Sequence, residues 1–458
     1  MLIDHLNRQR LERDAQGLTR LRRIAESPCA PRQVVSQGGQ PARELLVFGS
    51  NDYLGFANHA VLIQALAKGA QRFGAGSGAS HLISGHSRAH AALEGDLAAW
   101  LEPSIPNAEA LYFCTGFLAN VALLTALGDA SATIFADKLN HASLIDGALL
   151  ARAPMQRYAH RNLSVLASWL ERCATPIKLI VTDAVFSMDG DLADLPALLK
   201  LAERFDAWLI VDDAHGFGVL GTEGRGSLSH FGLRSERLIY MGTLGKAAGV
   251  GGAFVAAHPT IIDWLVQSAR SYIYTTAAPP AVAHALRESL RLIGSTEGDQ
   301  RRARLQQRIN QLREGLAELI AAHPALSWRL AESSTAIQPL IVGSNDAALA
   351  LMAVLDEQDL WVPAIRPPTV PVGTARLREG TVTAITGEAQ RDFHPATPTH
   401  RPPELEEFLP KSAQWVRSDA FDSEVTGESY AGTFYLDPGT DTVYFDTTNP
   451  RVPAGSAP

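Results

Sequence analysis

The sequence has few cysteines, little charge and no long apolar run. Its 458 residues include 3 Cys, and 19% are Asp, Glu, Lys or Arg. The cysteines are far apart and lack the CxxC spacing of zinc sites and redox pairs, so we expect reduced thiols. No stretch approaches the ~18 apolar residues of a membrane helix, and the first residues lack the pattern of a signal peptide. We therefore expect a cytoplasmic protein.

The excess of negative charge is confined to one end of the chain. Residues 379–458 contain 13 acidic and 5 basic residues, which accounts for the whole net charge of −8. The neutral remainder gives no general electrostatic reason to bind nucleic acid. The same segment holds 9 of the 26 prolines, and its apolar runs around Asp437-Pro438-Gly439 are compatible with a hairpin or a loose appendage.

The centre of the chain alternates short apolar runs with longer amphipathic stretches. Alternation of this kind, with strands apolar on both faces, is typical of a mostly parallel sheet covered by helices. After Pro259 the pattern is mainly helical and ends in a strand-helix-strand pattern at 337–365. We therefore expect an α/β protein with a large domain and a smaller α+β domain. The predicted segments are a helical arm (1–44), a large domain (45–258), a small domain (259–378) and an atypical Pro-rich acidic tail (379–458).

Candidate chemistry follows two of the predicted strands. The strand ending at Val211 leads into Asp212 and His215, and the next strand leads into Thr243 and Lys246. Because the carboxyl ends of parallel strands meet at one edge of a sheet, we expect these side chains to lie close together. A lysine here can form a Schiff base with pyridoxal phosphate (PLP), while an aspartate keeps the pyridine nitrogen protonated. The flanking glycines indicate close approach of the backbone to a bound group; they are Gly242, Gly245, Gly249, Gly251 and Gly252.

Two other glycine motifs fit nucleotide binding poorly. Gly74–Gly78 has no preceding apolar strand, so a dinucleotide site is a weaker interpretation than a tight turn. The Gly245-Lys246 pair lacks the other P-loop residues, since Tyr240 replaces a glycine and Ala247 replaces Ser or Thr.

Two further segments can complete a PLP site. At Thr115-Gly116-Phe117 an apolar strand turns into a helix, whose first N–H groups suit a phosphate. His141 is a candidate to stack on the cofactor ring, although a helix cap or a buried core histidine is the alternative interpretation.

Together these stretches resemble the α-oxoamine synthase family of fold-type-I PLP enzymes. The resemblance covers roughly residues 1–378. It rests on Ser50–Gly55, Gly76–Ser80, Thr115–Phe117, Asn140–Ser143, Val185–Asp191, Asp212–Gly216, the Lys246 segment and Ala364–Pro371.

The resemblance implies a role for each cofactor residue. Lys246 would form the Schiff base, Asp212 would pair with the pyridine nitrogen, and His215 would bond the ring hydroxyl. The other implied cofactor residues are His141 stacked on the ring, Ser187 and Thr243 at the ring and phosphate edge, Gly116 and Phe117 at the phosphate, and Thr275 and Thr276 reaching the neighbouring subunit's phosphate. A homodimer with PLP as cofactor is therefore expected, and no metal.

The resemblance also implies the substrates. Arg366 would hold the amino-acid carboxylate, for which a guanidinium fork is suited. Thr369 and Arg20 would contact the acyl substrate. Ser80 stands where glycine-using relatives often carry Thr, which favours L-alanine. The Ala364–Pro371 stretch is typical of the branch serving biotin biosynthesis, so the expected reaction condenses L-alanine with pimeloyl-CoA or pimeloyl acyl carrier protein and releases CO2.

Two alternatives stay open, and one segment departs from the family. A sister enzyme using glycine or serine would share most motifs, as would a noncatalytic partner subunit. The family normally continues after Arg378 into a strand with a His-containing turn and a closing helix. Here Glu379 begins unrelated sequence, so we expect the small domain to lack its usual last elements unless the tail substitutes for them.

Overall fold

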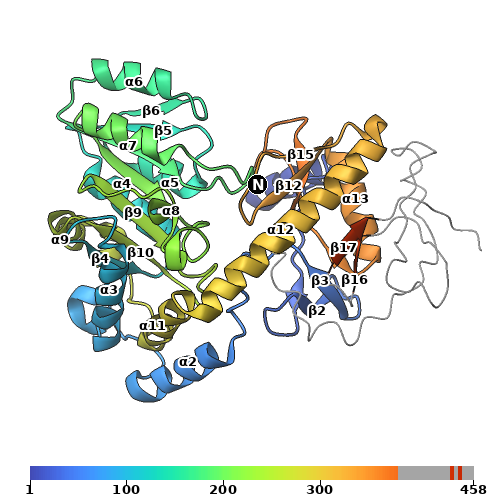
Figure 1. The fold of residues 1–458 in the computed structure, drawn as a ribbon, viewed down its shortest axis with the longest axis horizontal. Coiled ribbons are helices and arrows are strands. Elements are labelled where there is room, and N and C mark those ends of the chain that lie inside the picture. Colours follow the sequence, from blue (N-terminus) through green and yellow to red (C-terminus); the bar gives the residue numbers. More distant parts are fainter. Residues whose placement is uncertain (380–433, 438–441, 446–458) are drawn as a thin grey trace, which may run out of the picture. The chain divides into compact units, whose positions relative to one another are not determined.

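The computed structural model describes residues 1–379, 434–437 and 442–445, and the chain divides into two units (Figure 1). Unit 1 comprises residues 1–51, 188–190 and 304–458, and unit 2 comprises residues 52–187 and 191–303. The boundary between residues 303 and 304 lies within helix α12 (Thr296–Ala322). The sequence-based prediction placed the start of the small domain after residue 258. The intervening helix α11 (Pro280–Ile293) packs on α2 (Ala60–Phe73) and α3 (Arg88–Leu101), which explains its place in unit 2.

Unit 2 is built on a seven-stranded sheet of order β4-β10-β9-β8-β7-β5-β6. Strand β10 runs antiparallel to both of its neighbours, and the pairs from β9 to β6 are parallel. The mostly parallel sheet that the sequence predicted is therefore confirmed. Its strands are β4 (Glu109–Phe113), β5 (Ala132–Asp137), β6 (Met155–Tyr158), β7 (Ile177–Asp183), β8 (Trp208–Asp212), β9 (Leu238–Thr243) and β10 (Ala253–Ala257).

Helices lie beside this sheet because their apolar faces match the apolar strands (Figure 1). Helices α4 and α7 contact the strands, and α5 packs on α4. Leu123 of α4 and Leu144 of α5 are buried in the same core as Ile210 of β8. The remaining elements of unit 2 are α4 (Gly116–Leu127), α5 (Ala142–Leu150), α6 (Leu163–Arg172), α7 (Leu195–Arg204), α8 (Ser227–His230), α9 (Pro259–Ser268), α10 (Arg270–Ile273), and the short turns η1 (His81–Gly85) and η2 (Thr222–Gly224).

Unit 1 contains two four-stranded sheets, of order β1-β2-β3-β13 and β11-β12-β15-β14. Leu46, Leu316 and Leu377 are buried in one apolar core of this unit. Its elements are β1 (Ile24–Ala25), β2 (Arg32–Ser36), β3 (Arg43–Val47), the short turn η3 (Pro324–Leu326), β11 (Arg329–Leu330), β12 (Gln338–Gly343), α13 (Asn345–Glu357), β13 (Leu360–Trp361), β14 (Ala364–Ile365) and β15 (Ala375–Glu379).

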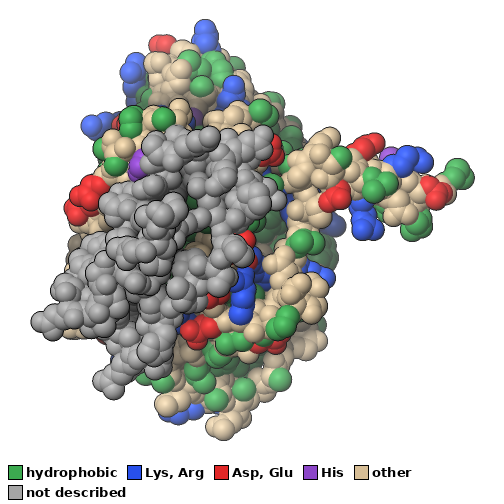
Figure 2. Space-filling model, turned by 90° about the vertical axis from the view of Figure 1, so that its right-hand side faces the viewer, with side chains coloured by type: hydrophobic (Ala, Val, Ile, Leu, Met, Phe, Trp, Pro, Cys, Tyr) green, Lys and Arg blue, Asp and Glu red, His purple; other side chains and the backbone are tan. Residues whose placement is uncertain are grey.

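The first helix is shorter than its sequence pattern indicates. Helix α1 (Leu2–Ala15) buries none of its residues, and side chains of every class are exposed along it (Figure 2). The spacing of Leu18, Leu21 and Ile24 after this helix is loosely helical, which predicts a helix that continues to residue 24. Instead Ile24 begins β1, which pairs with β2, so a β-branched residue at a strand start was assigned to a helix.

Two of the described strands lie beyond residue 378, where the family resemblance ends. Strand β16 (Phe434–Asp437) pairs antiparallel with β17 (Thr442–Phe445), which favours the hairpin of the two interpretations. The predicted loss of the closing strand and helix concerns residues from 380 onward that lie outside the described ranges. Among the described helices, none is long and apolar enough to cross a membrane.

Candidate active site

Three neighbouring parallel strands end at the same edge of the large sheet. Strand β7 ends at Asp183, β8 at Asp212 and β9 at Thr243, and the register pairs Asp183 with Asp212. The sequence-based prediction that Asp212, His215, Thr243 and Lys246 lie at one edge is consistent with this arrangement.

Asp212 is a buried carboxylate held by two donors. Asp212 is only 3% exposed. Ala214 N–H donates to Oδ1 at 3.0 Å, and Asn120 Nδ2 donates to Oδ2 at 2.7 Å. Because both oxygens receive a hydrogen bond, the carboxylate has a fixed orientation and its negative charge is stabilised within the sheet edge.

Lys246 meets His215 directly. Lys246 Nζ lies 2.9 Å from His215 Nε2, and His215 Nδ1 lies 2.6 Å from the hydroxyl of Tyr53. An ammonium can only donate, so a charged Lys246 makes Nε2 the acceptor and leaves the ring proton on Nδ1, which donates to Tyr53. Tyr53 is fully buried, so this row of three groups fixes the position of the amine.

The neighbouring Asp213 has a different environment. It accepts hydrogen bonds from Ser227 N–H at 2.7 Å and from the hydroxyl of Tyr240 at 2.8 Å. Burial raises the pKa of Asp213 to about 7, against the opposing effect of these donors. Asp213 therefore holds the backbone at Ser227. Neither of its two side-chain bonds involves the group formed by Lys246, His215, Tyr53 and Asp212, which we call the Lys246 cluster.

His141 precedes helix α5 and caps it. The ring nitrogen Nδ1 lies 2.7 Å from Ser143 Oγ and accepts a hydrogen bond from the Ser143 backbone N–H at 3.2 Å. The backbone N–H of His141 donates to Asp183 Oδ2 at 2.7 Å. The pKa of His141 is lowered by partial burial and by the charge of Lys246, with Asp212 acting in the opposite direction. Burial and the charge of Asp212 raise the pKa of Asp183 well above its usual range. His141 is thus both a helix cap and a neighbour of the cluster.

The start of helix α4 reaches the same group of residues. The helix begins at Gly116, and Thr115 Oγ1 accepts from Leu118 N–H at 3.2 Å. A Cβ on residue 116 would lie 2.7 Å from Thr243 Cγ2, so only glycine fits between the helix and β9. Thr243 Oγ1 in turn donates to the carbonyl of Ala214 at 3.3 Å. The anion-binding end of α4 and the end of β9 are therefore in contact.

The other predicted cofactor residues lie in unit 2, at the start of α4 and on turns. Phe117 is the second residue of α4 and is 47% exposed, and Ser187 is half-buried in the turn after β7. Ser80 forms a β-bridge with Thr276, which is exposed, and Thr275 is half-buried. Ser80 and Thr276 are thereby brought together.

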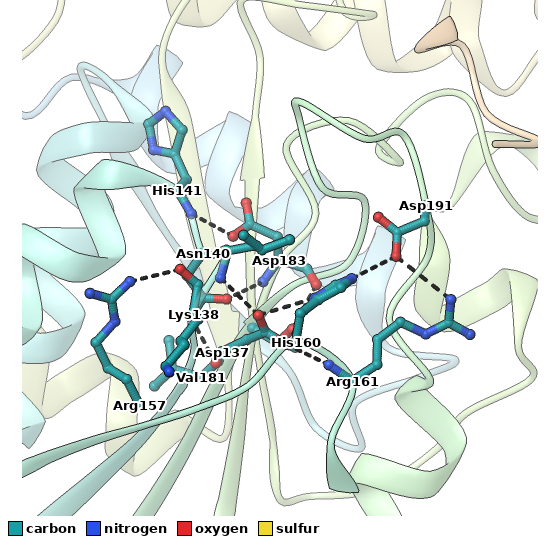
Figure 3. A network of polar contacts seen from close by, with 12 residues as sticks. Asp137, Lys138, Asn140, His141, Arg157, His160, Arg161, Val181, Asp183 and Asp191 are labelled. Carbon is teal, nitrogen blue, oxygen red and sulfur yellow. Dashed lines mark hydrogen bonds and ion pairs between the residues drawn. The ribbon is translucent and has the colours of Figure 1, made fainter. Parts of the chain in front are cut away.

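A charged network lies beside His141 at the same sheet edge (Figure 3). His160 Nδ1 is 3.1 Å from both carboxylate oxygens of Asp137, and Nε2 is 2.8 Å from Asp191 Oδ2. Burial opposes protonation of His160, but the two carboxylates outweigh it and raise the pKa to about 9. The His141 ring points away from this network, although its backbone joins it through Asp183 (Figure 3). The network fixes the loop from which His141 projects.

Three of the four predicted substrate residues lie in unit 1, and the fourth, Ser80, lies in unit 2. Arg366 follows β14 and donates from Nη1 to the carbonyl of Gly17, which joins it to the segment that carries Arg20. Thr369 is exposed, and its N–H donates to the carbonyl of Arg366 at 3.1 Å. Arg20 is also exposed. The structure thus connects the loop of Arg366 and Thr369 with the chain just before Arg20.

A separate group of histidines has ligand atoms within 4.8 Å of one another, namely His81, His86 and His90. His90 uses both ring nitrogens, since Nδ1 accepts from Ser87 N–H at 3.0 Å and Nε2 lies 2.8 Å from the carbonyl of Ala278. His81 Nδ1 and His86 Nδ1 lie 3.0 Å apart. With His90 engaged, two ligands remain, which is fewer than the three or four protein ligands of a zinc site.

Sequence reasoning assigned no role to three residues that the structure places in the cluster. Tyr53 and Ser143 were part of quoted motifs, and Asn120 was read only as part of a helix. One signal could have found Asn120: it is a polar residue on a face of α4 that otherwise buries Ala119 and Leu123. A buried amide needs partners, and partners at a strand end are functional candidates.

Comparison with known proteins agrees with this geometry. The aminotransferase class I and II family matches residues 43–388. The chain belongs to that family. It is 86% identical over 378 residues to 8-amino-7-oxononanoate synthase 2 of Polaromonas sp. strain JS666, a match covering 82% of this chain and 93% of the relative.

Solved structures extend the likeness to the fold. The 8-amino-7-oxononanoate synthase of Francisella tularensis matches with a TM-score of 0.61 at 32% identity, over 74% of this chain and 92% of that one. A variant of serine palmitoyltransferase from S. paucimobilis with a bound PLP–myriocin aldimine matches with a TM-score of 0.72 at 26% identity, over 88% of this chain and 94% of that one. The predictions of a fold-type-I enzyme of the 8-amino-7-oxononanoate synthase group, and of PLP as cofactor, are confirmed.

The residues at the sheet edge fit PLP. The cofactor needs an amine for its aldehyde, a carboxylate for its ring nitrogen and N–H groups for its phosphate. Lys246, the buried Asp212 and the start of α4 at Gly116 supply these groups from one edge of one sheet. Because residue 116 carries no side chain, the start of α4 packs directly against Thr243, and the first N–H groups of this helix are donors of the kind that bind a phosphate.

Proposed function

We propose that the chain condenses L-alanine with a pimeloyl thioester to give 8-amino-7-oxononanoate, the free thiol and CO2, using Lys246 and Asp212 as its central residues. The observation that carries the assignment is the meeting of a lysine amine, a histidine and a doubly hydrogen-bonded carboxylate at one sheet edge. A noncatalytic subunit would have no need to keep these groups in register. The relatives named above support the same activity.

Lys246 acts first as an anchor for the cofactor and then as a base. Bound PLP supplies an electron sink for the carbanion of the amino acid. With PLP and alanine bound, a free Lys246 amine would take the Cα proton of alanine. His215, held by Tyr53, keeps Nζ in place for both tasks.

Asp212 would keep the cofactor's pyridine ring electron-poor. Its charge, fixed by Ala214 and Asn120, holds a proton on the pyridine nitrogen. The Cα of alanine then bonds to the thioester carbonyl carbon, and the thiolate leaves and takes a proton from water. The carboxylate of the resulting β-keto acid departs as CO2, and the Lys246 ammonium returns a proton to that Cα. Lys246 and His141 are proposed to stabilise the negative charge on the thioester oxygen.

Arg366 is proposed to bind the carboxylate of alanine, with Thr369 and Arg20 toward the acyl chain. Support comes from the shared loop of Arg366 and Thr369 and from the bond between Arg366 and Gly17. Ser80, at its bridge with Thr276, is proposed to favour alanine. The remaining proposed cofactor contacts are His141 on the ring, Ser187 and Thr243 at the ring edge, and Phe117 at the phosphate.

A substrate panel tests the proposed activity. Purified protein with PLP is given pimeloyl-CoA or pimeloyl acyl carrier protein together with L-alanine, glycine or L-serine, and the product is identified by mass spectrometry. We expect the highest kcat/KM with L-alanine. A higher value with glycine or serine would assign the chain to a sister activity, and no product with any pair would reject the enzyme proposal.

We also propose a homodimer in which Thr275 and Thr276 reach the partner's phosphate site. Around these residues, unit 2 leaves apolar side chains in water: Ile83 is 80%, Tyr274 72% and Leu82 50% exposed. Exposed apolar residues on adjoining segments are typical of protein interfaces. Sedimentation tests the proposal, with a dimer expected. Thr276→Ala should weaken PLP binding, and a monomer with full PLP affinity would contradict it.

A further inference from the structure

We propose that Asn120 and Ser143 are positioning residues that join Asp212 to His141 and fix His141 in one tautomer, with its proton on the outward nitrogen Nε2. The inference rests on the proposed function, since it concerns two residues assigned to the PLP ring. It adds two residues to the site and gives a direction to each of its hydrogen bonds.

The direction follows from what each group can donate. An amide nitrogen only donates, and Asn120 Nδ2 contacts Asp212 Oδ2 at 2.7 Å and Ser143 Oγ at 2.9 Å. Its two hydrogens therefore go one to each partner. The reverse orientation of the amide would place two acceptors, Asn120 Oδ1 and a carboxylate oxygen, against each other, so the contact with Asp212 fixes the amide.

Ser143 passes this direction on to His141. Ser143 Oγ already accepts from Asn120, so its hydroxyl hydrogen is available for His141 Nδ1, which lies 2.7 Å away. Ser143 N–H points to the same Nδ1 at 3.2 Å. A nitrogen that faces two donors carries the lone pair, and in a neutral imidazole the proton is then on Nε2.

Three of the four residues in this row are buried, and His141 at its end is exposed. Asn120 has no exposed surface, Asp212 is 3% exposed and Ser143 is 1% exposed, so water cannot replace a lost partner at little cost. Asn120 Oδ1 has no hydrogen-bond partner within the described structure, so the amide is held by its two donated bonds. Asn120 is therefore placed for its donors, and its function is to orient the two groups that receive them.

The consequence for the reaction concerns proton supply. His141 faces Asp212, Lys246 and Asp146, and its backbone N–H binds Asp183. The hydrogen bonds to Nδ1 favour neutral His141, as do partial burial and Lys246, which lower its pKa. The outward Nε2–H can then donate to a developing negative charge on the substrate without adding a full positive charge over the cofactor ring.

The test is the state of His141 in the holoenzyme. Histidine labelled with ¹⁵N, assigned with His141→Gln, reports which ring nitrogen carries the proton and how His141 titrates. We expect the Nε2–H form in the unmodified protein. In Ser143→Ala, which removes one hydroxyl, we expect the pKa of His141 to rise by about half to one pH unit, with the acid limb of kcat shifting equally.

Asn120→Ala provides a second variant, with a smaller shift in the same direction. Because the two residues act in series, the double variant should shift the His141 titration no more than Ser143→Ala alone. Thr125→Val is the matched control on α4, since the Thr125 hydroxyl donates to the carbonyl of Val121 on its own helix. This control should leave both the tautomer and the pH profile unchanged.

The visible absorbance of bound PLP separates the two proposals. If unmodified protein does not bind PLP, the proposed function fails, while the His141 tautomer of the apoprotein still tests the hydrogen-bond row. If PLP binds and Ser143→Ala leaves the tautomer and titration of His141 unchanged, the row is overturned. A proton on Nδ1 of His141 in unmodified holoenzyme would overturn it as well.

Discussion

The two units hold their proposed functional residues in different ways. In unit 2 the carboxylate of Asp212 and the imidazole of His215 are buried at strand ends and bonded to further side chains. In unit 1 Thr369 and Arg20 are exposed on loops, and Arg366 bonds to a backbone carbonyl. The difference indicates that Asp212 and His215, which are proposed to act on the cofactor, are fixed by buried contacts. Arg20 and Thr369, which are proposed to act on the acyl substrate, lie on exposed loops. Changes in the two units should therefore have different kinetic signatures.

The largest effect is expected at Asp212. Asp212→Asn removes the charge that holds the pyridine proton, so kcat should fall by about 10³-fold or more while PLP still binds. Steady-state rates and PLP titration check this. The neighbouring Asp213→Asn is the matched control: it resembles the protonated form favoured by burial, so its rate should stay within about 10-fold. Equal losses at the two positions would contradict the separation of roles.

Arg366→Lys should produce the opposite pattern. Lysine keeps the charge but loses the two-pronged donor geometry, so KM for L-alanine should rise about 10- to 100-fold. PLP affinity and absorbance should not change. Arg329→Lys, at an exposed position of β11, is the control and should match the unmodified protein. A lower PLP affinity in Arg366→Lys without a change in KM would remove the distinction between the units.

Tyr53→Phe tests a buried support of the cluster. The substitution removes one hydroxyl from His215 and leaves the ring in place, so kcat should fall by about 10-fold or less. If Tyr53 acts by holding His215 in position, kcat should fall by a larger factor than KM changes. Unaltered kcat would show that His215 needs no second partner.

The smallest effect concerns stability at high pH. The folded-state pKa of His160, about 9, lies above the ordinary value of 6.5. A raised pKa stabilises the fold fully below about pH 6.5, and this contribution is lost as pH rises through 9. It is on the order of 2 kcal/mol after allowance for the partial exposure of the ring. His160→Gln should thus lower the melting temperature clearly at pH 6 and little at pH 10, and an equal loss at both would exclude the charged network as the cause.

Much of the fold follows from local pattern. The strand ending at Asp212 and the helices beginning at Gly116 and Ala142 were predictable because apolar runs, glycines and caps lie close together in sequence. The Ile24 strand was not, since its identity depends on pairing with Ser36 in β2. Long-range pairing of this kind leaves little trace in a local pattern.

The site was predictable to the extent that its residues follow strands or belong to motifs. Lys246 and Asp212 could be named because Asp212 ends one strand of a parallel sheet and Lys246 follows the next. The hydrogen-bond row through Asn120 could not, because Asn120 and Asp212 are 92 residues apart and only folding makes them neighbours. Tyr53 and His215 are likewise separated by 162 residues.

The central claim is that Lys246 carries the cofactor, and borohydride reduction tests it most directly. Holoenzyme is reduced, digested and mapped by mass spectrometry, with Lys178 of β7 as an internal comparison, since its amine donates to the carbonyl of Phe205. We predict that reduction bleaches the visible band and leaves the phosphopyridoxyl group on the peptide containing Lys246. A label on any other lysine, or a visible band that reduction leaves unchanged, would contradict the account.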